Sequence, residues 1–322
     1  MKEILLKIIR KVSFYFNKQK VEIPPHFSAY FKNAKLNETD YHKPVHGREA
    51  GNALIFKLLK TNTPFLVCRY GDAELSVVSN YLYNYITGEH IWNDYIKSIT
   101  WGLNGINPTN DQTLVRFAKI YLDQTPLIDV LAVWNNRGED FITRFICPHA
   151  ELISLQTLEP FFVITEPWSR ALEGKKVLVI HPYEESIQKQ HSKHQLLFNN
   201  TFPPFDLITY KPFNTITHDQ SVNFDWFDEL EKMKIDITAL SFDVALVTAG
   251  PFGFPLAAYI KGMGKQAIHI GGALQLFFGL KGRRWENREH QAFFNEHWIY
   301  PSDDETPVDY MKMKVDGGDY WK

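Results

Sequence analysis

The chain has 322 residues, of which 44% are hydrophobic and 22% are charged, and its formal net charge at pH 7 is −2. This composition is typical of a globular protein with one large core or two smaller ones, and the near-zero charge excludes a strong overall attraction to nucleic acid. The two cysteines, Cys68 and Cys147, lie in apolar runs, which argues against a disulfide scaffold and indicates buried thiols in a reducing compartment such as the cytoplasm.

The first 20 residues are more basic than the rest of the chain. They carry six Lys or Arg residues and one acid, Glu3, around apolar residues at near-helical spacing. Basic residues interrupt any signal-peptide core, and no run reaches the roughly 18 apolar residues of a membrane span. The pattern predicts a basic amphipathic helix peripheral to the inner face of a membrane, with a helix packed on its own domain or a frayed arm as alternatives. We expect an arm and irregular lead-in over residues 1–45 and one domain over residues 46–322.

Apolar runs and helical periods alternate along the rest of the chain. Short apolar runs predict buried strands, and helices of about 10 to 15 residues between them predict βαβ units. We therefore expect an α/β fold with a Rossmann-like, mostly parallel sheet flanked by helices, and an extended tail from residue 300 onward. The predicted helices cover residues 46–60, 75–86, 111–122, 184–199, 226–233 and 254–263, and the predicted strands cover 64–68, 127–133, 175–181, 205–210, 242–248 and 265–270.

An Asp-x-Glu pair follows the first predicted strand, within the segment Arg69–Glu74. Ligands of α/β sheets bind at the carboxyl ends of the strands. In an extended segment, side chains two positions apart lie on the same side, so the carboxylates of Asp72 and Glu74 are expected to converge. Such oxygens suit Mg²⁺ or Mn²⁺, which can hold a diphosphate, and Gly71 permits a sharp turn or a close approach to a ligand. An isolated pair of this kind is more often an ordinary turn with solvated acids.

Two later strands run into glycine-rich turns. Gly250 and Gly253 follow strand 242–248, while Gly271 and Gly272 follow strand 265–270, with Gln275 just beyond. At such turns the backbone N–H groups of a helix N-terminus can face a bound anion. The match to the dinucleotide pattern G-x-G-x-x-G is poor, so a turn that only packs helix against strand is the alternative.

Three cations follow the second glycine turn, at Lys281, Arg283 and Arg284. Their side chains could meet phosphate oxygens, and an arginine can do so bidentately. The alternative is a solvated basic loop, which is the usual setting of clustered charges. Two glycine turns at adjacent strand ends favour a ligand site more strongly than either turn does alone.

Strand 175–181 ends at His181, and Glu184 begins the helix predicted after it. Either side chain could act as a base or position a substrate hydroxyl at the ligand edge. Glu185 suits the dipole at the helix N-terminus and is interpreted as structural. His191 and His194 lack the spacing of a metalloprotease motif and are interpreted as helix surface.

The segment Arg69–Glu74 resembles the R-F-G-D-G-E signature of GT-D-type glycosyltransferases, a bacterial family long catalogued as a domain of unknown function. Residues 174–182, 250–261, 271–275, 278–285, 295–298 and 317–321 resemble associated polysaccharide-cluster proteins. The resemblance covers roughly residues 46–322 and implies a Rossmann-like fold that transfers a sugar from a nucleotide donor. It also implies that Asp72 and Glu74 serve the metal and the nucleotide-sugar. Tyr70 and Ala73 stand where the signature has Phe and Gly, and Asp319 stands where relatives often carry Cys.

These features predict a metal-dependent glycosyltransferase of the hexosyltransferase class, acting in cell-surface polysaccharide or glycoprotein glycan assembly with a UDP-sugar donor. Mn²⁺ or Mg²⁺ on Asp72 and Glu74 would neutralise the charge of the departing diphosphate. Backbone N–H groups of the glycine turns would add electrostatic stabilisation, together with Lys281 or Arg283. The other residues expected to bind the donor are Arg69, Gly71, Gly250, Gly253, Gly271, Gly272 and Gln275.

The sequence also bears on the catalytic base, the acceptor and two alternative functions. An inverting enzyme would use His181 or Glu184 as its base, whereas a retaining enzyme can do without one. The expected acceptor is a glycan, which could be lipid-linked, and no nucleic-acid partner is expected. A nicotinamide-dependent oxidoreductase would need an acid about 20 residues after Gly250, where this chain has His269. A non-catalytic nucleotide- or glycan-binding protein would keep the glycine turns without needing both Asp72 and Glu74.

Overall fold

The structure of the chain is a computed structural model that describes residues 41–87, 92, 94–102, 105–136, 138–163, 165–198, 201–213, 224–286, 289–307, 320 and 321. The amphipathic helix expected within residues 1–20 and most of the expected lead-in lie outside the described residues, as does Asp319. Within the described residues no helix is both long enough and apolar enough to cross a bilayer.

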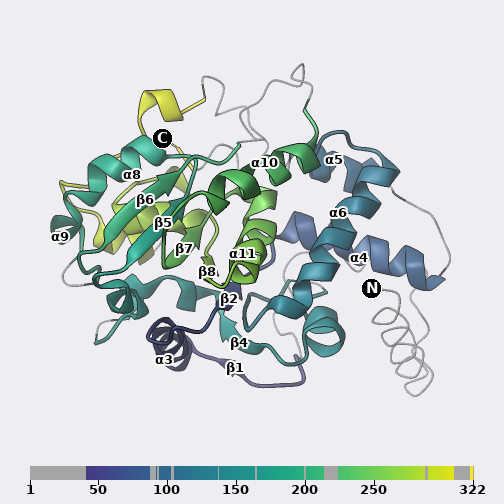
Figure 1. The fold of residues 1–322 in the computed structure, drawn as a ribbon, viewed down its shortest axis with the longest axis horizontal. Coiled ribbons are helices and arrows are strands. Elements are labelled where there is room, and N and C mark those ends of the chain that lie inside the picture. The colour runs from purple at the N-terminus through teal and green to yellow at the C-terminus, as the bar shows by residue number, and fades with distance from the viewer. Residues whose placement is uncertain are drawn as a thin grey trace.

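One parallel sheet forms the centre of the described structure (Figure 1). Its strands are β1 (Val45–His46), β2 (Phe65–Cys68), β3 (Val130–Val133), β4 (Glu151–Ser154), β5 (Lys176–Ile180), β6 (Asp206–Tyr210), β7 (Val244–Val247) and β8 (Gln266–His269). Their order across the sheet is β1-β4-β3-β2-β8-β7-β5-β6, and each neighbouring pair is parallel. The predicted α/β class and parallel sheet are therefore confirmed.

Helices cover both faces of the sheet, so every residue of β2, β3, β7 and β8 is buried, as is usual for parallel strands. Alternate residues of one strand enter different cores: Leu66 and Cys68 pack on one face, while Phe65 and Val67 pack on the other. The longer helices are α3 (Arg48–Leu59), α4 (Asp72–Thr87), α5 (Asp94–Gly102), α6 (Asp111–Gln124), α8 (Glu184–His191), α10 (Trp226–Thr238) and α11 (Gly253–Gly262).

Neighbouring strands send the chain to opposite faces of the sheet. β2 leads into α4 and β7 leads into α11, and both helices pack in the core that contains Leu75 and Leu256. β5 leads into α8, and β8 leads into the 3-10 segment Gly272–Phe278, and both pack in the other core, with Ile187 and Leu274. The chain therefore diverges between adjacent strands at the carboxyl edge, which opens crevices of the kind that bind ligands in α/β folds.

Several predicted elements differ from the structure. The strands β1 and β4 were not predicted, because β1 has two residues and β4 has only two apolar residues, Leu152 and Ile153. The division expected after residue 45 falls within β1, and the preceding Tyr41 is buried against Glu139. The helix expected over residues 184–199 is broken after His191 and continues as α9 (His194–Leu197).

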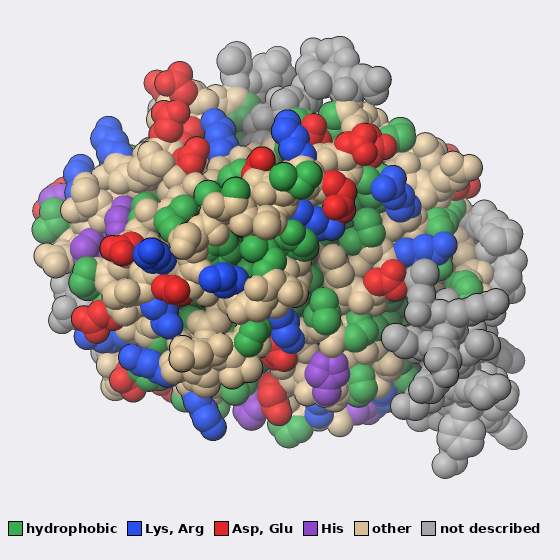
Figure 2. All heavy atoms as spheres, in the orientation of Figure 1, with side chains coloured by type: hydrophobic (Ala, Val, Ile, Leu, Met, Phe, Trp, Pro, Cys, Tyr) green, Lys and Arg blue, Asp and Glu red, His purple; other side chains and the backbone are tan. Residues whose placement is uncertain are grey.

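The distribution of surface charge and the burial of the thiols agree with what the sequence indicated. Figure 2 shows basic and acidic side chains interspersed over the face drawn in Figure 1, without a large area of one sign. Cys68 and Cys147 are both free and buried, as expected. Burial raises the pKa of the Cys147 thiol to about 12. These thiols therefore serve packing within the core.

Candidate functional site

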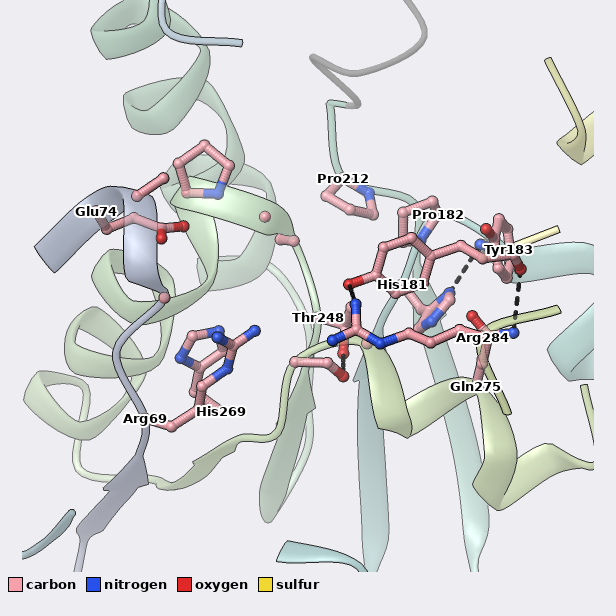
Figure 3. Close-up of a pocket in the computed structure, with 18 of the residues that line it drawn as sticks. Arg69, Glu74, His181, Pro182, Tyr183, Pro212, Thr248, His269, Gln275 and Arg284 are labelled. Atoms are coloured by element: carbon pink, nitrogen blue, oxygen red, sulfur yellow. Dashed lines mark hydrogen bonds between the residues drawn. The ribbon is translucent and has the colours of Figure 1, made fainter. Parts of the chain in front are cut away.

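A cavity of about 260 Å³ lies at the carboxyl edge of the sheet (Figure 3). Segments that follow six strands contribute to it, so side chains far apart in the sequence share one space. The lining residues are Arg69, Gly71, Asp72, Ala73 and Glu74 after β2; Trp134 after β3; His181, Pro182 and Tyr183 after β5; Pro212 and Phe213 after β6; Thr248, Ala249, Gly250 and Pro251 after β7; and His269, Gly271, Gly272, Gln275, Arg284, Tyr320 and Trp321 at β8 and beyond.

The two carboxylates of the Asp-x-Glu pair do not sit as predicted. Helix α4 begins at Asp72, three residues earlier than the sequence indicated, so Asp72 and Glu74 both lie in its first turn. In a helix, residues two positions apart point about 200° apart around the axis, whereas in a strand they share a side. The extended geometry from which their convergence was expected is therefore absent, although both residues line the cavity.

The Glu74 side chain turns back over the start of its own helix. A Cβ on Gly71 would overlap the Glu74 carboxylate, so any larger residue here would make that side chain move. Burial raises the pKa of Glu74 above its usual range, Asp72 adds to this, and the positive charge of Arg69 opposes it. Gly71 thus serves the local position of Glu74, which the sequence did not indicate.

A divalent cation fits this site only if the ligand supplies most of its coordination. Among the described residues, no three His, Cys, Asp or Glu side chains gather to hold a metal ion. Asp72 is exposed at the cavity, whereas Glu74 is turned over Gly71. Mg²⁺ commonly binds one or two carboxylates together with substrate phosphates and water. The arrangement therefore fits a cation shared between Asp72 and a phosphate, and not a cation held by both carboxylates.

His181 lies just after β5 and is 3% exposed. Its Nδ1 accepts a hydrogen bond from the backbone N–H of Tyr183 (3.0 Å), so the neutral ring carries its proton on Nε2. Burial lowers the pKa of His181 to about 3, and Nε2 has no hydrogen-bond partner among the described residues. His181 is therefore a neutral N–H donor at the cavity, which argues against the base role expected for it.

Glu184, the other expected base, lies outside the cavity. Its Oε1 accepts a hydrogen bond from Thr209 Oγ1 on β6 (2.7 Å). The N-terminus of its helix is instead held by Glu305, whose carboxylate accepts hydrogen bonds from the backbone N–H groups of Glu185 (2.8 Å) and Ser186 (3.3 Å). The tail expected to be extended thus forms a 3-10 turn, Asp303–Glu305, that packs on α8. Glu184 therefore supports β6 through Thr209 and does not line the cavity.

The four glycines of the two turns have different roles. Gly250 lines the cavity with a φ of 50°, and a Cβ there would meet only open space. Gly253 does not line the cavity. The His269 ring lies where a Cβ of Gly253 would be. A Cβ on Gly271 would come within 2.5 Å of the Arg69 guanidinium, and one on Gly272 would overlap the Tyr320 ring.

His269 ends β8 and contacts the Gly253 backbone at the start of α11. Burial lowers the pKa of His269 to about 3, and the charge of Arg69 contributes in the same direction. Its Nδ1 has no hydrogen-bond partner among the described residues. Like His181, this imidazole is neutral, and its position beside Arg69 gives Gly253 a packing role in place of the expected ligand contact.

Only one of the three cations after the second turn reaches the cavity. Arg284 lines it, and its Nη1 donates to the Tyr320 hydroxyl (2.9 Å). Lys281 lies over the Tyr300 ring, with Nζ 4.7 Å from the ring centroid, and Arg283 is exposed outside the cavity, although its backbone N–H donates to the Trp321 carbonyl (2.9 Å). The structure therefore does not place Lys281 or Arg283, which were expected to meet the ligand, in the cavity lining.

Gln275 lines the cavity as predicted, but its amide is used within the protein. Its Nε2 donates to the carbonyls of Leu280 (3.3 Å), Lys281 (3.1 Å) and Tyr320 (3.3 Å). This side chain therefore ties the segment after β8 to the end of the chain. Figure 3 shows Gln275, Arg284 and Tyr183 on the same side of the cavity, opposite Glu74 and Arg69.

Several lining residues were not singled out by the sequence. Trp134 follows β3, and its indole N–H donates to the Tyr70 carbonyl (3.1 Å). Tyr320 and Trp321 lie in the region expected to be an extended tail, yet Trp321 is 2% exposed and its indole N–H donates to the Glu305 carbonyl (3.0 Å). Trp134 could have been identified from the sequence, because it comes directly after a predicted strand. No local sequence pattern indicates that Tyr320 or Trp321 lines the cavity.

Comparisons with known proteins add a distant structural likeness. No protein-family model matches the chain, and no curated protein matches it. The chain is similar to a selenomethionine-substituted structure of domain of unknown function 1792 (DUF1792), with 13% sequence identity and a TM-score of 0.42, over 82% of this chain and 93% of that one. A likeness of this size assigns neither a family nor an activity, so function must be inferred from the geometry of the site.

Proposed function

We propose that this chain is a glycosyltransferase that takes a sugar from a nucleotide-sugar, with a UDP-sugar as donor, and transfers it to a glycan acceptor. The observation that supports this best is the cavity at the carboxyl edge of the parallel sheet, which brings acidic, cationic and neutral donor groups around one space. Sugar hydroxyls need hydrogen-bond acceptors, and a departing nucleoside diphosphate needs cations and N–H donors. This cavity offers both kinds of group.

The chemistry of each cavity-lining side chain suggests its role. Arg69 and Arg284 are the guanidinium groups of the cavity lining, and His181 offers a neutral N–H. Asp72 is the carboxylate that would hold Mn²⁺ or Mg²⁺ together with the donor phosphates, and Glu74 is left to accept a hydrogen bond from a sugar hydroxyl. The cation would supply Lewis-acid stabilisation of the leaving diphosphate. With Glu184 outside the cavity and His181 a donor, neither residue serves as the base.

The proposed acceptor is a growing glycan of the cell surface, which could be carried on a lipid. The support for a membrane-linked acceptor is the basic, amphipathic composition of residues 1–20. A peripheral contact through this arm would bring the enzyme to an acceptor at the inner face of a membrane. Its test is anionic-vesicle binding by the chain with and without residues 1–20.

Thermal stabilisation by nucleotides tests the proposed function directly. A ligand that binds only the native state raises the melting temperature by mass action. We expect UDP to raise it more with Mn²⁺ than with EDTA, and we expect at least one UDP-sugar to be turned over to UDP in the presence of metal. Stabilisation by NAD⁺ without stabilisation by any nucleoside diphosphate would support an oxidoreductase instead. Stabilisation by UDP-sugars without any turnover, across a panel of acceptors, would indicate a binding protein.

A further inference from the structure

Two helix N-termini at the cavity edge are already occupied by carboxylates of the chain itself. In α/β folds the phosphates of a nucleotide commonly sit at such an N-terminus, where backbone N–H groups are free. Here the carboxylate of Glu305 accepts hydrogen bonds at the start of α8, and the Glu74 carboxylate lies over Gly71 at the start of α4. A phosphate at either position would meet a negative charge.

Some backbone N–H groups of the remaining turns already donate within the fold. At the start of α11, the N–H of Phe252 donates to the Ala249 carbonyl (3.0 Å) and that of Gly253 to the Gly250 carbonyl. Pro251 and Pro255 have no N–H to offer. After β8, the N–H of Gly271 is directed to the Val247 carbonyl (3.4 Å). Part of the backbone N–H set that could bind a diphosphate at these turns is therefore used within the fold.

Guanidinium groups lie on both sides of the Gly271–Gly272 turn. The Arg69 guanidinium lies against the Cα of Gly271, and Tyr320 lies against the adjacent Gly272. Tyr320 in turn accepts a hydrogen bond from Arg284, whose guanidinium carbon is 5.3 Å from the centroid of the same ring. Both arginines line the cavity, and Figure 3 shows both guanidinium groups directed into it from its two sides.

We propose that Arg69 and Arg284 together form the diphosphate site, which holds the donor across Gly271–Gly272 in place of a helix N-terminus. This inference rests on the proposed function, because it assigns a subsite of the same cavity. A guanidinium binds phosphate oxygens bidentately, which a lysine cannot do. The two glycines are required because any Cβ would push Arg69 or Tyr320 away from this arrangement.

Substitutions at neighbouring arginines test the assignment. Arg284→Gln removes one positive charge from the cavity but can still bond to Tyr320, whereas Arg283→Gln removes an equal charge from the preceding residue, which lies outside the cavity. We expect Arg284→Gln to bind inorganic pyrophosphate and UDP at least about tenfold more weakly than the wild type, as measured by calorimetry. Arg283→Gln should stay within about twofold, since exposed charges contribute little. Arg284→Lys and Arg69→Lys should each show a partial loss.

The outcomes separate this inference from the proposed function. If the wild type binds UDP while Arg284→Gln and Arg283→Gln bind it equally well, the assignment fails and the proposed function stands. A loss of UDP binding with pyrophosphate binding unchanged would place Arg284 at the nucleoside and would also overturn the assignment. If the wild type binds neither UDP nor any nucleotide-sugar, the proposed function fails together with the site. The Arg284→Lys variant keeps the charge, so it provides the measurement if the Gln variant does not fold.

Discussion

Among single residues, three glycines of the cavity each have another side chain in the space that a Cβ would fill. Arg69 lies against Gly271, Tyr320 against Gly272, and the Glu74 carboxylate over Gly71. In a packed interior even one added methyl group must displace a neighbour. The glycines therefore leave room for cavity-lining side chains, whereas the sequence suggested direct backbone contact with a ligand.

Gly272→Ala is expected to destabilise the fold and weaken donor binding. The added Cβ would overlap the Tyr320 ring, so Tyr320 and the Arg284 bonded to it must shift. Overpacking of this kind costs about 1–3 kcal/mol. Gly262→Ala is the control, because no atom lies within 4 Å of its Cβ and its conformation suits any residue in a helix; it should be neutral or stabilising by up to about 1 kcal/mol. Urea denaturation and UDP titration of both variants check this, and equal effects would contradict it.

Glu139 is expected to make stability depend on pH. It is fully buried, and burial raises its pKa to about 7, opposed by hydrogen bonds from Tyr41 and from the backbone of Trp134 and Asn136. Because the folded pKa lies above the ordinary value of 4.5, its contribution to stability is complete below about pH 4.5 and is lost as pH rises through about 7. At about 1.4 kcal/mol per pKa unit, the loss amounts to about 3 kcal/mol.

The isosteric variant Glu139→Gln isolates this effect. Its carbonyl oxygen can accept in place of Oε2, and its amide replaces Oε1, which has no partner among the described residues. The free energy of unfolding of the variant should change less than that of the wild type between pH 4.5 and 8, as followed by urea denaturation. Parallel pH profiles for the two proteins would show that Glu139 does not titrate in this range.

At the scale of elements, the start of α4 decides what the Asp-x-Glu pair can do. The sequence predicted the strand before it correctly, but an extended segment through Glu74 was wrong. Acidic residues at the first positions of a helix are stabilised by its dipole, so Asp72 and Glu74 favour an early helix start. That choice separates the two carboxylates and leaves Asp72 at the cavity rim.

Asp72→Asn and Glu74→Gln are therefore expected to behave differently. Both changes are nearly isosteric, and both should lower transfer. Only Asp72→Asn should abolish the extra thermal stabilisation that Mn²⁺ gives to the UDP complex, because the proposed function assigns the cation to Asp72 and the phosphates. Thermal shift with UDP in Mn²⁺ and in EDTA measures this difference. Loss of the metal effect in both variants would restore the view that both carboxylates bind the metal.

At the scale of the whole molecule, the N-terminal arm and the domain are expected to act separately. Each basic residue near an anionic membrane contributes about 1 kcal/mol, weakened by salt, and residues 1–20 carry six of them. The full chain should bind anionic vesicles at low salt, and a chain beginning at Val21 should not. The shortened chain should keep UDP binding, because the proposed site residues begin at Arg69. Equal vesicle binding by both chains, or unfolding of the shortened one, would refute a membrane role for the arm.

Local sequence patterns were enough to predict the parallel sheet and the edge at which the cavity forms. Six of the strands were predictable because each is a short, continuous apolar run, which is a local signal. The two strands β1 and β4 lacked that signal, having two apolar residues or fewer at buried positions. The positions of Gly250, Gly271 and Asp72 at one edge followed from the rule that parallel strands present their carboxyl ends together.

Which of these side chains share the cavity, and in which protonation state, depends instead on how distant segments pack together. Arg284 and not Arg283 lines the cavity, because it bonds to Tyr320, 36 residues away. Glu305 fills the N-terminus of α8 from 120 residues away in the chain. The hydrogen bond from Tyr183 gives His181 its donor tautomer, and burial keeps the ring neutral. Contacts between distant segments and the loss of solvent around a buried ring leave no mark in a local sequence pattern, because both arise only when the chain has packed.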